Sequence, residues 1–319
     1  MDNFITSEEF IFNTRVFQKI STENVNGELI LKKSTDIMKK LEHILSFYND
    51  NSDITKINKN AGKDFVNVSD STFEIIKKSK YYSQLTDGLF DISVAPLVKA
   101  WSICNDSPKV LNNDTINKLL PLINYNDIIL DEENISIMLN KENQKIDLGG
   151  IAKGYIADLI IDFYKENNVK SAIVNIGGNI KVLGRKSHED LWQIGIYKPI
   201  KHSTDIICSL AVEDLSIVTS GVYERAFISN NKLYHHILDP HTGYPASTDI
   251  MSITIVNESS LLCDALATPL LIMGTFEASK FMQNHNIEGI IITTNNKIIL
   301  SKSLLNKFNL HENYDVLCF

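Results

Sequence analysis

The chain of 319 residues has 31 lysines and arginines against 39 aspartates and glutamates, a net charge of -8, and 44% of its residues are apolar. This composition is typical of a globular protein with a sizeable core and excludes a disordered or fibrous chain. Because a net acidic chain has no general attraction to phosphate backbones, we expect no nucleic-acid partner.

The cysteines and the N-terminal residues bear on the compartment. Cys104, Cys208, Cys263 and Cys318 show neither C-x-x-C spacing nor a short disulfide framework, so we expect reduced, mostly buried thiols. No apolar run approaches the ~18 residues of a transmembrane segment, and the first residues lack the pattern of a signal peptide. The sequence as it stands favours a cytoplasmic protein without a transmembrane segment. The alternative is an exported or lipid-anchored protein whose signal has been removed.

Hydrophobic periodicity in the first half predicts both strands and helices. We expect a strand over 10–20, an amphipathic helix over 34–48, and a helix opened by the capping box Ser71-Thr-Phe-Glu74. A long apolar stripe predicts a helix over 149–164. A short buried strand over 171–176 then ends at Gly177-Gly178, where glycine permits a positive φ or a close backbone approach.

The second half is richer in expected strands. They cover 192–197, 206–212, 233–238, 252–256, 289–294 and 297–300, with helices over 260–273 and 276–285. This mixed order predicts an α+β or mixed α/β fold with a largely antiparallel sheet. No linker or repeat divides the chain, so we expect one domain over 1–319 built of two interlocked lobes.

An acid and two glycines lie at the start of the helix expected over 149–164, in Ile146-Asp-Leu-Gly-Gly-Ile-Ala-Lys-Gly-Tyr155. Exposed amides and the helix dipole attract an anion at such a corner, and Lys153 adds a positive charge. The segment therefore suits a phosphate. The alternative is an ordinary N-cap at Asp147 with glycines required by tight packing.

Three histidines gather in Tyr234-His-His-Ile-Leu-Asp-Pro-His-Thr-Gly-Tyr-Pro245. Histidine can move a proton near neutral pH, and a loop can present it to substrate. A zinc site is a rival interpretation, but His235 and His236 should face opposite sides of a strand. A plain hairpin with no chemical role is the third alternative.

A third candidate segment, Cys263-Asp-Ala-Leu-Ala-Thr-Pro269, places Asp264 and Thr268 one helical turn apart. Their oxygens, with a carbonyl nearby, are the hard ligands that Mg²⁺ or Ca²⁺ prefers. The alternative is a structural hydrogen bond between Asp264 and Thr268 in a helix bent by Pro269.

Read together, the segments resemble the ApbE family of FAD:protein FMN transferases over nearly the whole chain. The matching motifs are Ser46-Phe-Tyr-Asn-Asp-Asn-Ser-Asp-Ile-Thr-Lys-Ile-Asn58, Thr86-Asp-Gly-Leu-Phe-Asp91 with Ala95-Pro-Leu-Val and Trp101, Asp147 to Gly154, Asn175-Ile-Gly-Gly-Asn179, Thr219-Ser-Gly-Val-Tyr-Glu-Arg225, His236-Ile-Leu-Asp-Pro-His-Thr-Gly243 and Asp264-Ala-Leu-Ala-Thr268. The resemblance implies an ApbE-like, T-fold-like body. It also implies cleavage of FAD and Mg²⁺-dependent attachment of FMN, by a phosphoester, to a threonine or serine of an acceptor flavoprotein, with release of AMP.

The resemblance assigns roles to individual residues. It implies metal binding by Asp264, Thr268 and the carbonyl of Gly150, and proton transfer by His236. Residues matching positions that line the FAD site are Phe12, Tyr48, Leu89, Phe90, Asp91, Asp147 and Lys153. Two further functions stay open: an FAD pyrophosphatase that releases FMN and AMP, and a flavin-binding carrier without turnover.

Overall fold

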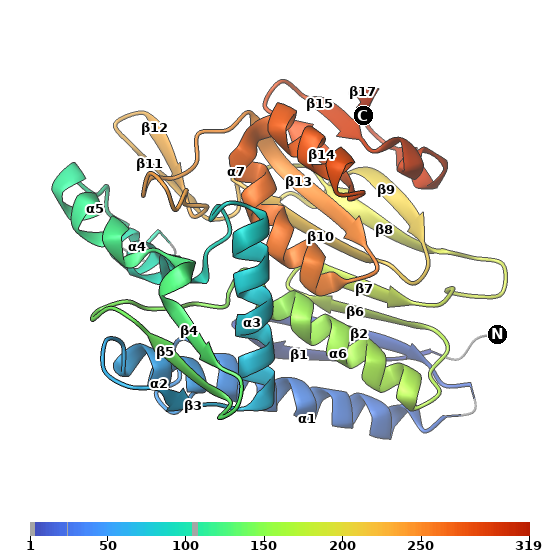
Figure 1. Cartoon of the computed structure of the whole chain (residues 1–319). Helices are drawn as coiled ribbons and strands as arrows, with labels where there is room; N and C mark the ends of the chain where they lie inside the picture. Colours follow the sequence, from blue (N-terminus) through green and yellow to red (C-terminus); the bar gives the residue numbers. More distant parts are fainter. Residues whose placement is uncertain (1–3, 24, 104–107) are drawn as a thin grey trace. The chain divides into compact units, whose positions relative to one another are not determined.

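The computed structural model describes residues 4–23, 25–103 and 108–319, so Cys104 lies outside the described residues. The chain divides into two compact units, each assembled from separate stretches (Figure 1). Unit 1 comprises residues 1–42, 153–221 and 248–319, and unit 2 comprises 43–152 and 222–247. The expectation of one interlocked domain stays a prediction.

A nine-stranded sheet forms the centre of unit 1, in the order β1-β2-β6-β7-β10-β13-β14-β15-β17. All neighbours pair antiparallel except β15 and β17, which are parallel. The strands are β1 (Phe4–Ile11), β2 (Thr14–Ser21), β6 (Ala172–Ile176), β7 (Asn179–Leu183), β10 (Ser216–Gly221), β13 (Ile250–Asn257), β14 (Glu288–Thr293), β15 (Lys297–Leu300) and β17 (Asp315–Cys318). The predicted mixed fold with a largely antiparallel sheet is confirmed.

Three helices pack on one face of this sheet: α1 (Gly27–Leu45), α6 (Ala152–Glu166) and α7 (Ser260–Asn284) (Figure 1). The buried Gln18 side chain of β2 joins two of them, since it accepts a hydrogen bond from Ser34 of α1 (2.7 Å) and from Tyr164 of α6 (2.6 Å). Helix α7 packs on β10 and β13. This packing holds the three helices against the sheet.

A second, three-stranded sheet in unit 1 has the order β16-β9-β8. Its strands are β8 (Trp192–Tyr197), β9 (Ile206–Val212) and β16 (Phe308–Leu310). Trp192, Ile194 and Leu210 share a buried cluster with Ile217 of β10. Ser220 of β10 lies 3.5 Å from Thr268 of α7. Because side chains alternate along a strand, Ile217 and Ser220 point to opposite faces of the sheet, so the small sheet and α7 cover opposite faces of the large one.

Unit 2 is more helical. Its helices are α2 (Asp53–Lys59), α3 (Asp70–Leu85), α4 (Ala95–Trp101) and α5 (Asn113–Leu119). Its strands are β3 (Val66–Asn67), β4 (Ile128–Asp131) and β5 (Ser136–Leu139), in the antiparallel order β3-β5-β4, and the separate hairpin β11 (Ala226–Ser229) and β12 (Lys232–His235). Leu97, Trp101, Ile116 and Leu238 form a buried cluster in this unit.

Several expected elements differ from the structure, among them the strand expected over 233–238, which is β12 and ends at His235. The strand over 10–20 is a hairpin, because Phe12 and Asn13 both take positive φ (57° and 54°) and form a two-residue turn between β1 and β2. Helix α1 begins at Gly27, seven residues before Ser34. Helix α3 is capped by Ser69 and not by Ser71, since the Ser69 hydroxyl accepts the Thr72 N–H.

The two helices expected over 260–273 and 276–285 are confirmed, because α7 is interrupted at Gly274, whose φ of 78° and ψ of 168° are not helical. By length and composition alone, α7 could cross a membrane, the one such helix among the described residues. Its most apolar window is 56% buried inside the protein, and α7 packs on the sheet. These are the properties of a core helix.

Candidate functional site

A carboxylate of α7 and the first turn of α6 meet in unit 1. Asp264, 6% exposed, accepts a hydrogen bond from the Gly154 N–H at 2.9 Å. The Lys153 ammonium lies 3.3 Å from one carboxylate oxygen of Asp264 and 3.5 Å from the other. Two motifs separated by more than a hundred residues therefore form one charged cluster.

Hydroxyl groups continue this cluster along α7. Thr268 lies one turn beyond Asp264, and its Oγ1 is 3.5 Å from the Ser220 hydroxyl of β10. Asp264 uses its carboxylate toward Lys153 and Gly154, which does not support the alternative of a structural Asp264–Thr268 bond. One carboxylate and two hydroxyls are the hard donors that suit Mg²⁺, so the residues fit the implied metal.

The close approach of α6 to α7 requires glycine at position 154. A Cβ on Gly154 would lie 2.3 Å from the Ser260 carbonyl oxygen and 2.8 Å from the Asp264 Cβ. Real Cβ atoms do not approach a main-chain oxygen so closely, because the two atoms would overlap. In a close-packed interior, the two helices would have to move apart to make room. The glycine ending the Asp147-to-Gly154 motif thus positions Asp264, a role that its place at the motif's end could have indicated.

Further polar groups hold the N-terminus of α7. The Asp158 carboxylate of α6 accepts the N–H groups of Ser260 (2.8 Å) and Leu261 (3.0 Å) and pairs with the buried Lys181. The Ser260 hydroxyl donates to Asn179 Oδ1 at 2.7 Å. A carboxylate at a helix N-terminus is favourable for its unpaired amides and its dipole. The Asn175–Asn179 motif therefore supports the helix that carries Asp264.

The Asp147 corner lies in unit 2. Its Oδ1 accepts the Gly149 N–H (3.0 Å), and its own N–H donates to the Ile92 carbonyl (2.8 Å). Helix α6 begins only at Ala152, so the N-cap interpretation of Asp147 is wrong. Gly150, half-buried beside Phe90, lies two residues before that helix.

The Leu89-Phe90-Asp91 segment is largely buried in unit 2, with Phe90 5% and Asp91 6% exposed. Asp91 accepts hydrogen bonds from the Ser93 N–H and hydroxyl (both 2.7 Å) and from the Tyr125 N–H (2.9 Å). Burial raises the pKa of Asp91 despite these bonds. Its carboxylate is thus engaged in holding the segment, which favours a positioning role over direct ligand contact.

The adjacent histidines have different surroundings. His235 is buried, its Nε2 lies 3.0 Å from the Ala246 carbonyl, and burial lowers its pKa. His236 is half-buried in the bend after β12; its N–H donates to the Arg225 carbonyl at 2.9 Å, and its Nδ1 lies 3.3 Å from the same oxygen. Two histidines so placed do not form one metal site.

His241, to which the sequence assigned no role, joins two motifs of unit 2. Its Nε2 lies 2.9 Å from the Asp87 carbonyl, and the Trp101 indole donates to the Gly243 carbonyl at 2.8 Å. The Thr86–Asp91 and His236–Gly243 motifs are therefore neighbours. Their adjacency needed long-range contacts that sequence spacing does not report.

Two predicted FAD residues occur near surfaces. Phe12, in the β1–β2 turn of unit 1, donates its N–H to Glu42 at 2.6 Å. Tyr48, 78% exposed, packs edge-on against Phe47 in unit 2 (5.4 Å). These roles stay predictions, as does the metal-ligand set, because Gly150 belongs to unit 2 and Asp264 with Thr268 to unit 1.

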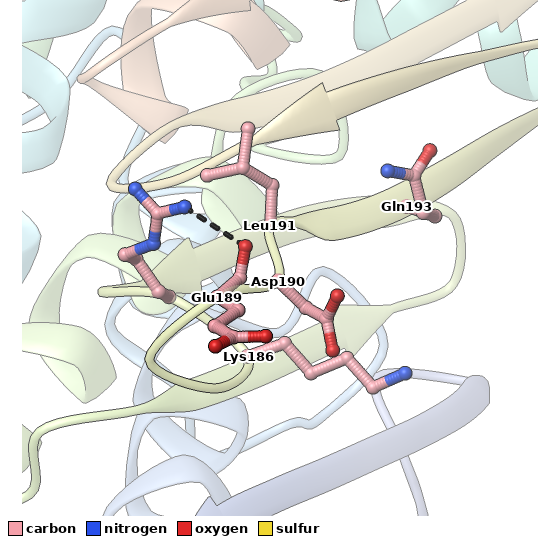
Figure 2. A pocket seen from close by; sticks show the side chains of 6 residues that line it. Lys186, Glu189, Asp190, Leu191 and Gln193 are labelled. Carbon is pink, nitrogen blue, oxygen red and sulfur yellow. Dashed lines mark hydrogen bonds between the residues drawn. The ribbon is translucent and has the colours of Figure 1, made fainter.

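Figure 2 shows an open polar hollow beside the β7–β8 connection of unit 1. Its lining residues are Arg185, Lys186, Glu189, Asp190, Leu191 and Gln193. Arg185 donates to the Glu189 carbonyl at 3.2 Å, and the lining mixes two cations with two acids. None of the predicted site residues lies here. Within the described ranges, no three His, Cys, Asp or Glu side chains cluster as a metal site, at the candidate site or away from it.

Comparisons with known proteins give a consistent result. The sequence profile of the ApbE family matches residues 12–291. The FAD:protein FMN transferase of Klebsiella pneumoniae is 35% identical, covering 92% of this chain and 91% of that protein. The enzyme of the same name from Treponema pallidum is 28% identical, covering 92% and 84%. The crystal structure of the ApbE protein of Thermotoga maritima superposes with a TM-score of 0.87 at 30% identity, covering 94% and 98%.

Proposed function

Because this chain belongs to the ApbE family, we propose that it is a Mg²⁺-dependent FAD:protein FMN transferase whose acceptor is a threonine or serine hydroxyl. The family resemblance and the transferase class predicted from the sequence are confirmed. The metal, the acceptor residue and the roles below are the proposal.

In this reaction the acceptor hydroxyl oxygen bonds to the phosphorus on the FMN side of the FAD pyrophosphate. The bond from that phosphorus to the oxygen of the AMP half breaks, and AMP leaves. The hydroxyl proton passes to a base. No oxidant or reductant is required, since the flavin ring is unchanged.

The charged cluster of unit 1 is the observation that carries the proposal. Lys153 supplies a cation and Asp264 a nearly buried carboxylate, with the Thr268 and Ser220 hydroxyls beside them. Lys153 suits a phosphate oxygen because an ammonium group is a mobile point charge. Asp264 and Thr268 would hold Mg²⁺, which supplies positive charge that stabilises the pyrophosphate and the departing AMP.

His236 is the proposed base. A hydrogen bond from its Nδ1–H to the Arg225 carbonyl, at 3.3 Å, selects the tautomer whose lone pair is on Nε2. A neutral imidazole can take the acceptor proton at Nε2 near pH 7. Because the main-chain N–H of His236 also donates to the Arg225 carbonyl at 2.9 Å, the backbone that carries the ring is held in place as well.

Flavin fluorescence of an acceptor protein after denaturing electrophoresis tests the proposal. The chain is incubated with FAD, Mg²⁺ and a candidate flavoprotein, with Asp264→Ala and His236→Ala as matched variants. Covalent fluorescence that needs Mg²⁺ and is lost in both variants supports the transferase. FMN and AMP released without labelling would instead identify a pyrophosphatase, and FAD binding without cleavage a carrier.

A further inference from the structure

The β11–β12 hairpin of unit 2 ends at the proposed base. Ala226 pairs with His235 at its open end and Ser229 with Lys232 at its tip, and His236 follows directly. The turn residues Asn230 and Asn231 both have positive φ (49° and 58°), as a tight two-residue hairpin requires. The geometry of the hairpin is therefore well specified by its own sequence.

The two faces of this hairpin differ. On one face Phe227 stacks on Tyr234 (5.3 Å, 18°), and Tyr234 lies 5.7 Å from the Trp101 ring of the unit's core. On the other face Ile228 and Leu233 are directly opposite each other, yet are 73% and 47% exposed. A cross-strand apolar pair normally gains from burial, so this pair remains available for a partner.

The outer edges of the hairpin carry main-chain groups without a strand partner. The N–H of His236 donates to Arg225, which makes these two residues a hydrogen-bonded pair. Since such pairs alternate along an antiparallel ladder, the N–H and C=O groups of Ile228 and Leu233 point outward. Among the strands of the described residues, β11 and β12 pair only with each other. Such an edge can accept an added strand.

Charge also favours a particular partner. The hairpin, residues 226–235, contains Lys232 and no aspartate or glutamate, whereas the whole chain has a net charge of -8. Lys232 is exposed at the tip; it precedes Leu233 but lies on the opposite face, with its Nζ 5.5 Å from the centre of the Tyr234 ring. A segment with acidic residues would therefore be attracted to this hairpin, while the rest of the chain favours no acidic partner.

We propose that the β11–β12 hairpin is the docking surface for the acceptor, binding an extended segment of the acceptor protein as a third strand along β12. An apolar side chain of that segment covers Leu233 and Ile228, and an acidic one lies near Lys232. At about 3.3 Å per residue, Leu233 is roughly 10 Å from His236, so the apolar anchor lies about three positions from the reacting hydroxyl. This inference rests on the proposed function.

A library of 14-residue peptides with one central threonine and randomised flanks tests the inference. Peptides are incubated with the chain, FAD and Mg²⁺, and those carrying covalent flavin are sequenced. Free FMN and AMP are measured in parallel with the unaltered chain. We expect labelled peptides to be enriched in an apolar residue about three positions from the threonine, on one side, and in an acidic residue beyond it.

Substitutions on the hairpin make the test specific. Leu233→Lys should replace the apolar preference by aspartate or glutamate at the same position, a gain that an unfolded variant cannot produce. Ile228→Thr should lower labelling at limiting peptide by roughly fivefold to tenfold, the equivalent of about 1 kcal/mol. Ile206→Thr, at another exposed strand isoleucine (43%) in unit 1, is the matched control and should leave labelling unchanged.

Each remaining outcome decides between the two proposals. Labelled peptides without a positional preference, or an unchanged preference in Leu233→Lys, would overturn the docking surface and leave the transferase standing. FAD cleavage by the unaltered chain without any labelled peptide would likewise overturn docking by an extended segment. Failure to cleave FAD at all would remove the proposed function itself. If Leu233→Lys converted a dimer of the chain into a monomer while labelling stayed unaltered, the hairpin would be assigned as the binding surface for a second copy of the chain, and docking of the acceptor would be overturned.

Discussion

Substitution of Gly154 by alanine tests the helix contact that positions Asp264. The added Cβ would lie 2.3 Å from the Ser260 carbonyl oxygen, 2.7 Å from its carbon and 2.8 Å from the Asp264 Cβ. Main-chain atoms in a packed helix cannot rotate away as a side chain can. The start of α6 must therefore move off α7, which lengthens the hydrogen bond of 2.9 Å from the Gly154 N–H to Asp264.

The expected loss in the free energy of unfolding of Gly154→Ala follows from two destabilising terms and one stabilising term. Overpacking of a filled interior costs about 1 to 3 kcal/mol, and the main-chain contact places Gly154→Ala near the upper limit. Weakening of a hydrogen bond to a carboxylate adds part of its roughly 1.5 to 3 kcal/mol. The better helix propensity of alanine returns at most about 1 kcal/mol. A net loss of about 3 kcal/mol corresponds to a fall in Tm of roughly 5 °C for a chain of this length.

Thermal unfolding and Mg²⁺ titration of activity are the assays. Gly149→Ala is the matched control, because Gly149 is exposed and a Cβ on it would meet no atom closer than 3.4 Å. We expect its free energy of unfolding to change by less than about 0.5 kcal/mol. Gly154→Ala should also require more Mg²⁺ for half-maximal activity because the carboxylate is displaced. An unaltered Tm with an unaltered Mg²⁺ requirement would refute the claim that this contact positions Asp264.

Further substitutions at Asp264, Thr268, His236 and His235 address the proposed roles. Asp264→Ala should abolish Mg²⁺-dependent activity in a folded protein, and Thr268→Ala should raise the Mg²⁺ requirement less, as titrations would show; an Asp264→Ala chain that only unfolds would favour a structural role. In single-turnover flavinylation, His236→Ala should be slower by about 10² to 10⁴ fold while still binding FAD, and His235→Ala should be far milder; equal losses, or repair of His236→Ala by excess Mg²⁺, would contradict this. Burial lowers the pKa of His235 in the folded state below its ordinary 6.5, so between these two pKa values the unfolded chain binds more protons at His235 than the folded chain does. The stability that neutral His235 contributes is therefore present above pH 6.5 and is lost as the pH falls through the pKa of the folded state. Denaturant unfolding across this range should show a shallower acid loss for His235→Gln.

Local pattern was sufficient for most elements. Strands β8, β9 and β15 have the bounds expected from alternation and from β-branched content. The β1–β2 hairpin was missed because its turn residues, Phe12 and Asn13, carry neither glycine nor proline. The cap of α3 was displaced because Ser69 and Ser71 offer the same hydroxyl and only the tertiary contact of Asp53 with Ser69 separates them.

The sequence singled out Asp264, Thr268 and Lys153, but it did not indicate the contacts that bring them together, and their roles stay predictions. Asp264 and Thr268 share a helix face, which the i, i+4 spacing indicates directly. Their approach to Lys153, Gly154 and Ser220 depends on contacts between distant segments, which hydrophobic periodicity does not encode. The alternative of an N-cap at Asp147 is wrong for a related reason: an acid before two glycines satisfies a local turn as readily as a helix start.

The ratio of AMP released to FMN bound covalently, measured in one reaction with FAD, Mg²⁺ and a flavoprotein acceptor, tests the central claim most directly. A transferase that passes FMN from FAD to a threonine or serine yields one AMP for each protein-bound FMN, and both products disappear together in Asp264→Ala. AMP accompanied only by free FMN, or protein-bound flavin formed without AMP, would contradict the account.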